Sequence, residues 1–131
     1  MVSNAHRGYL KEKMIRDQLK EQGWLIVFKS VRWRFGTYDY AHLFDVVAYK
    51  NQERKFISSK HFTNGDYHLP HQEDIRKHVE LYGKEGESYE LWLWDKPRWT
   101  GRAPNKVWNP GGFKIIIIIK NTQGPSAIAA A

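Results

Sequence analysis

The chain has no cysteine among its 131 residues, which excludes disulfides and thiolate metal sites. The absence also fits a reducing compartment such as the cytoplasm. Long apolar runs are missing too, since the longest, Ile115–Ile119, is far too short to cross a bilayer. Residues 1–7 contain no apolar signal segment. We therefore expect a soluble, cytoplasmic protein with no membrane partner.

Acidic residues are scarce relative to basic ones. There are 21 Lys and Arg against 14 Asp and Glu, which gives a formal net charge of +7. This charge predicts a polyanionic partner, most often nucleic acid. The six Trp, seven Tyr and six Phe can stack on bases, although aromatic residues also build dimer interfaces. Two segments combine aromatic with basic residues, and we expect them to contact DNA through Arg32, Arg34, Arg98 and Arg102.

The hydrophobic periodicity predicts an α/β fold. We expect helices at 5–22 and 70–82, and strands at 24–29, 43–50, 55–62, 89–94 and 113–120. The segments 30–41 and 95–112 resemble loops. Strands placed between helices predict a mixed sheet of about five strands flanked by helices. The length suits a single domain over residues 1–120, followed by a flexible tail at 121–131.

Two of the predicted strands carry polar side chains inside apolar runs. A two-residue turn between the strands 43–50 and 55–62 places Asp45 opposite Ser58, with Lys60 as the diagonal neighbour. A carboxylate and an ammonium group in such a hairpin are costly unless they are paired or used. The hairpin is therefore a candidate site.

Glu12 is the next candidate. It falls at helical spacing with Ile15 and Leu19, which should face the sheet. A rim carboxylate with its head in water is the ordinary interpretation of such a residue. The alternative is a carboxylate directed into the hairpin site that this helix covers.

These residues carry a family resemblance. Glu12, the pair Gly23-Trp24, Asp45, Lys60 and the stretch His71–Lys77 follow one another in an order similar to that of the PD-(D/E)XK nuclease superfamily. Within it the chain most resembles the archaeal-type Holliday junction resolvases, which also occur in viruses and phages. The resemblance covers about residues 6–94 and implies a restriction-endonuclease-like fold.

The resemblance also implies an activity and roles for individual residues. The expected protein is a homodimeric endonuclease that resolves four-way DNA junctions with Mg²⁺, or Mn²⁺ in its place, and without an organic cofactor. Asp45 is the expected central metal ligand and Glu12 a second one. Lys60 is expected to polarise the attacking water, and Gln72 to orient water or Lys60. Ser30 corresponds to a serine near the scissile phosphate.

Position 58 departs from the family, which has an acidic residue two positions before the lysine. Three interpretations remain open. The carboxylate has moved to Glu73, as in restriction enzymes with Ser-x-Lys, twelve further residues and Glu, and Glu73 is then the third metal ligand. Alternatively, Ser58 is a substitution that disables cleavage, or the protein binds DNA without cutting it. Another restriction-like or repair-like nuclease of the superfamily is the alternative function.

Overall fold

The computed structural model describes residues 4–33 and 36–120, and the tail predicted at 121–131 lies outside this range. The chain has a fold with two helices and nine strands over the described residues. The elements are α1 (Asn4–Glu21), β1 (Leu25–Lys29), β2 (Val31–Trp33), β3 (Gly36–Tyr38), β4 (Val46–Lys50), β5 (Glu53–His61), α2 (Leu69–Tyr82), β6 (Glu87–Asp95), β7 (Arg98–Thr100), β8 (Val107–Asn109) and β9 (Gly112–Ile118).

Five strands form a mixed sheet in the order β1-β4-β5-β6-β9. The β5–β6 pair is parallel and the other neighbours are antiparallel. Parallel strands need a crossover connection, which α2 supplies between β5 and β6. The predicted restriction-endonuclease-like α/β fold with about five strands is therefore confirmed.

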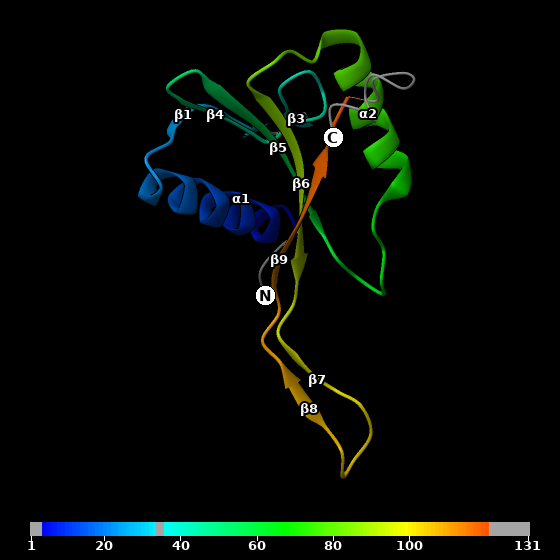
Figure 1. The fold of residues 1–131 in the computed structure, drawn as a ribbon. Coiled ribbons are helices and arrows are strands. Elements are labelled where there is room, and N and C mark those ends of the chain that lie inside the picture. Colours follow the sequence, from blue (N-terminus) through cyan, green and yellow to red (C-terminus); the bar gives the residue numbers. More distant parts are fainter. Residues whose placement is uncertain (1–3, 34–35, 121–131) are drawn as a thin grey trace.

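The two helices lie on opposite faces of the sheet (Figure 1). Ile15 and Leu19 of α1 pack in one cluster of buried residues with Val46, Ile57 and Trp92. The second cluster lies under α2 and contains Ile75, Val79, Phe44, Val47, Phe56, Tyr89, Leu91 and Leu93. This two-layer core holds β4 and β5 between the helices, so side chains at their ends have fixed positions.

The end of α1 follows from the sequence. The N–H of Trp24 bonds to the carbonyl of Leu19 at 2.9 Å, and that of Gly23 to the carbonyl of Lys20 at 3.0 Å. This pair of hydrogen bonds defines the Schellman motif, which needs a residue with positive φ after the helix. Gly23 meets this need with a φ of 89°. The predicted stop at Gly23 is confirmed.

Both segments that resembled loops contain paired strands instead. Val31–Trp33 pairs with Gly36–Tyr38, and Arg98–Thr100 pairs with Val107–Asn109. Trp99 lies opposite Trp108 with ring centroids 5.4 Å apart, a cross-strand aromatic pair that stabilises a hairpin. These strands have three residues each and lie among Pro and Gly residues, so their sequences show too little periodicity to be recognised.

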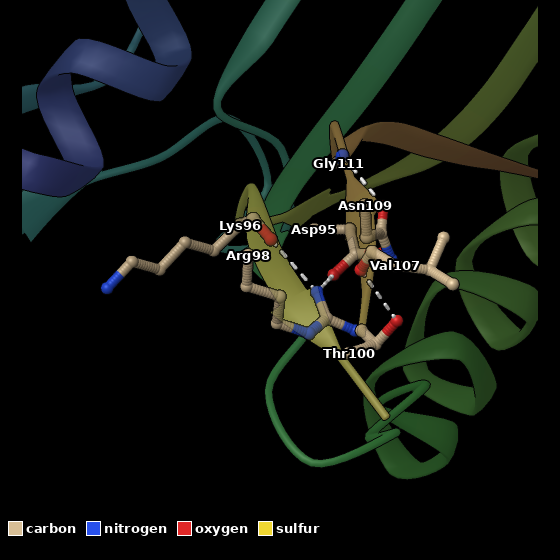
Figure 2. A network of polar contacts seen from close by, with 7 residues as sticks. All are labelled: Asp95, Lys96, Arg98, Thr100, Val107, Asn109 and Gly111. Carbon is tan, nitrogen blue, oxygen red and sulfur yellow. Dashed lines mark hydrogen bonds and ion pairs between the residues drawn. The ribbon is translucent and has the colours of Figure 1, made fainter. Parts of the chain in front are cut away.

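The β7–β8 ribbon, Arg98–Asn109, projects away from the body of the molecule (Figure 1). Figure 2 shows its base, where Arg98 bonds both to the Asp95 carboxylate and, at 2.9 Å, to the Lys96 carbonyl. Gly111 has φ of 68°, and a Cβ atom there would lie 2.1 Å from the Asp95 carbonyl oxygen. The base of the ribbon is therefore tightly packed.

None of the helices in the described part of the chain combines the length and the apolar character needed to cross a membrane.

Candidate active site

Residues of α1 and β5, together with the segment between β3 and β4, surround a small pocket at one end of the sheet. The cavity has a volume of about 250 Å³. We call it the carboxylate pocket, and its lining consists of Gly8, Lys11, Glu12, Asp39, Asp45, Ser59, Lys60 and His61. The structure thus brings together Glu12, Asp45 and Lys60, three residues singled out in the sequence and separated by up to 48 positions along the chain.

Local structure explains how each of the three arrives there. Glu12 lies on the stripe of α1 that faces the sheet and is only 4% exposed, so it is no rim carboxylate. Asp45 directly precedes β4, and its N–H bonds to the Ile57 carbonyl at 2.8 Å, which continues the β4–β5 register. That register places Asp45 opposite Ser58, as the two-residue turn predicts. Lys60 lies near the end of β5.

A hydrogen-bond network holds the Asp45 carboxylate. The Ser59 N–H donates to Asp45 Oδ2 at 2.6 Å. The Ser30 hydroxyl lies 3.1 Å from Asp45 Oδ1 and 2.5 Å from Asp39 Oδ1. One hydroxyl has a single proton and cannot donate to two carboxylates at once. Asp39 and Asp45 therefore compete for Ser30, and a shared proton or a cation would satisfy both.

The electrostatics of the pocket favour a bound positive charge. Burial, together with the nearby negative charges of Glu12 and Asp39, raises the pKa of Asp45 to about 7 against the opposing hydrogen bond from Ser59. At neutral pH the pocket therefore contains an incompletely ionised carboxyl group. A cation would favour its ionised form.

Asp39 was not predicted from the sequence. It lies in the segment 30–41, which was expected to be a loop, and nothing in its neighbourhood marks it as a site residue. Its place in the pocket depends on the β2–β3 hairpin, which brings the chain back toward Ser30 before β4 begins. Only its position six residues before Asp45 could have drawn attention to it.

Ser58 lies beside the pocket but does not line it. Its hydroxyl is 1% exposed and lies 2.7 Å from Nε2 of His71, in the first turn of α2. Burial lowers the pKa of His71, and the positive charge of Lys60 lowers it further, so the ring is neutral at neutral pH. A hydroxyl this buried cannot reach a substrate. The Ser58–His71 pair is a second feature that the sequence did not predict.

The two predicted residues on α2 point elsewhere. The Gln72 side-chain amide donates to the Tyr67 carbonyl at 2.7 Å, which closes the loop before the helix. The Glu73 carboxylate accepts hydrogen bonds from Arg76, 3.0 Å from its Nε, and its side chain remains 45% exposed. Neither residue lines the carboxylate pocket. The Glu73 carboxylate pairs with Arg76 on the outer face of α2, away from the pocket in which Asp45 lies, so the structure does not bring these two expected metal ligands together.

The predicted DNA-binding residues fall into three groups. Ser30 joins the network of the pocket. Arg98 and Arg102 belong to the β7–β8 ribbon and the turn between its strands, and Arg98 is already engaged at the base (Figure 2). The Arg32 backbone belongs to β2, while its side chain and the whole of Arg34 lie outside the described residues.

Among the side chains that the structure describes, no group of three or more His, Asp and Glu residues is arranged as a ready-made metal site. Magnesium does not require one, because it keeps several water molecules and is usually bound through one or two carboxylates. The hard oxygen atoms of Glu12, Asp39 and Asp45 suit such an ion. No protein-family model matches the chain, and no curated protein matches it.

Proposed function

We propose that this chain is a metal-dependent endonuclease of the PD-(D/E)XK type that resolves four-way DNA junctions. The observation that carries the proposal is the convergence of Glu12, Asp39, Asp45 and Lys60 on one pocket at the end of a mixed sheet. Carboxylates can hold a divalent ion for phosphodiester hydrolysis, and a nearby lysine can stabilise the negative charge that develops on the phosphate. The net charge of +7 supports a polyanionic substrate.

Each side chain has a role in the proposed reaction. Asp45 and Glu12 would hold Mg²⁺ or Mn²⁺, with Asp39 bound directly or through water. When bound, the ion lowers the pKa of a coordinated water molecule and neutralises charge that develops on the phosphate. Lys60 stabilises negative charge on the reacting oxygen atoms. Ser59 and Ser30 orient the Asp45 carboxylate through their hydrogen bonds.

Junction resolution requires two cuts in opposed strands, which a symmetric dimer can provide. The outer edge of β9 has no strand partner in the described part of the chain. On this strand and just beyond it, Ile115, Ile117 and Ile119 are exposed, Ile117 to 60%. Exposed apolar residues on an edge strand are a liability unless they are covered. This surface supports a homodimer that meets through β9.

The test is cleavage of a synthetic four-way junction and of a linear duplex of equal length in Mg²⁺, with Asp45→Asn as control. Symmetric nicks in the junction alone support the resolvase proposal. Equal cutting of both substrates would favour another nuclease of the superfamily. Any metal-dependent nick would exclude a DNA-binding protein without nuclease activity.

A further inference from the structure

A second cavity adjoins the carboxylate pocket, and its chemistry is different. It has a volume of about 790 Å³, and we call it the aromatic groove. Its lining residues are Leu10, Lys11, His61, Phe62, Thr63, Trp94, Lys96 and Pro97. Lys11 and His61 line both cavities, so the two share a wall. None of the described residues that line the groove carries a carboxylate, whereas three carboxylate side chains line the carboxylate pocket.

The arrangement of α1 explains this contrast. Successive residues of a helix diverge by about 100°. Glu12 therefore points into the carboxylate pocket. The Lys11 side chain extends over the groove, where its Nζ atom lies 4.1 Å from the centre of the Trp94 ring. On the sheet side, Phe62 follows β5 and its N–H bonds to the Trp94 carbonyl at 2.8 Å. The groove thus begins where β5 and β6 end.

Cations surround the apolar lining of this groove. Lys11 lies over Trp94, and Lys114 lies over the Phe62 ring with its Nζ atom 5.1 Å from the ring centre. Lys96 is exposed, and Figure 2 shows its side chain extending away from the network at the base of the ribbon. Ammonium groups around an aromatic surface suit a ligand that has both a negative charge and a flat apolar face.

We infer that the aromatic groove binds an unpaired nucleotide of the DNA strand that enters the carboxylate pocket. In a duplex the faces of the bases are covered by their neighbours, so only an unstacked base can occupy an apolar groove. The two phosphates that flank this nucleotide in the strand meet Lys11 and Lys96. This inference rests on the proposed function, and it defines the substrate as DNA with unpaired nucleotides beside the scissile phosphate.

Binding in EDTA tests the groove without cleavage. The probes are a fluorescein-labelled single strand of about twelve nucleotides, a size within the range of single-strand sites, and the duplex of the same sequence. The variants are Trp94→Leu and Leu10→Gln. Met14→Gln is the matched control, because Met14 is equally exposed one turn further along α1 and does not line the groove.

We expect Trp94→Leu and Leu10→Gln to bind the single strand at least about fivefold more weakly, because base stacking on an aromatic ring is lost or displaced. Duplex affinity should change less than about twofold, as should both affinities of Met14→Gln. Equal losses for single strand and duplex, or no loss for Leu10→Gln, overturn the inference. Leu10→Gln decides the case if Trp94→Leu fails to fold, since Leu10 lies exposed on a helix.

Cleavage in Mg²⁺ separates this inference from the proposed function. If wild-type protein cuts junctions but its binding does not depend on the groove, the inference fails and the nuclease proposal stands. If single-strand binding depends on the groove but no DNA is cut, the nuclease proposal fails and the groove remains a strand-binding site.

Discussion

The hydroxyl oxygen of Ser58 lies 2.7 Å from Nε2 of His71, at the position where a nuclease of the proposed type would carry a carboxylate. The pair is neutral, because burial and Lys60 keep the pKa of His71 below its usual value. A neutral hydroxyl in place of an acid removes one negative charge from the neighbourhood of Lys60. Glu73 pairs with Arg76 on the outer face of α2 and does not replace that charge, and among the described residues Asp39 is the one further carboxylate that lines the pocket beside Glu12 and Asp45.

Ser58→Glu should therefore increase the rate of junction cleavage in Mg²⁺ by about a hundredfold or more, the usual worth of one electrostatic contact in a transition state. Single-turnover kinetics measure the effect. Ser58→Gln is the matched control, because it has the same size without the charge. An equal gain in both variants would mean that side-chain volume, not charge, limits the reaction.

Glu73→Gln should leave the cleavage rate unchanged. It removes only an exposed ion pair with Arg76, and a solvent-screened surface pair of this kind contributes little to the free energy of unfolding. Parallel cleavage assays and thermal melts of the variant check both parts. A complete loss of cleavage with normal folding would show that Glu73 reaches the metal after all.

Asp45→Asn should abolish cleavage but keep DNA affinity within about twofold, because binding depends mostly on phosphate contacts. It should also stabilise the metal-free protein at pH 8. The folded pKa of Asp45 is about 7, against 3.8 for the ordinary group, so the folded state binds more protons between these values. Stability is therefore lost as the pH rises through this window.

Thermal melts of wild type and Asp45→Asn in EDTA, at pH 5 and pH 8, measure this effect. We expect Asp45→Asn to melt higher by about 4 °C or more at pH 8, and by clearly less at pH 5. Added Mg²⁺ should raise the melting temperature of the wild type at pH 8 and not that of the variant. A wild type that is more stable at pH 8 than Asp45→Asn in EDTA would contradict the raised pKa.

Removing a cation from the turn of the β7–β8 ribbon should reduce the salt dependence of DNA binding. For Arg102→Gln, we expect the slope of log affinity against log salt to fall by about one unit if Arg102 contacts a phosphate. Lys84→Gln is the control, because Lys84 follows α2 at the opposite end of the sheet. Fluorescence anisotropy at several salt concentrations provides the slopes, and identical slopes would exclude a phosphate contact by Arg102.

The sequence predicted the main sheet and both helices because their apolar residues follow regular periods. It also placed Glu12 on the helix stripe of Ile15 and Leu19, leaving open whether its carboxylate lies at the rim or in the site. It predicted that Asp45 and Ser58 are opposite one another, since two-residue turns have fixed geometry. Asp39 could not be predicted, because its position depends on a short hairpin with no periodic pattern. The direction of the Glu73 side chain could not be predicted either, because neighbouring residues of a helix differ in direction by about 100° and a small error in the helix position turns an inward side chain outward.

Gly111 limits how this protein can change. The close approach of its Cα to the Asp95 carbonyl leaves no room for a side chain, so any other residue forces the two connections of the ribbon apart. Because the ribbon is long relative to its base (Figure 1), a small rotation there moves the distal turn by a much larger distance. Sequence variation at this glycine would therefore redirect the ribbon without altering any residue of its two strands. In a library of variants, substitutions at position 111 would change the direction of the ribbon without changing its charge.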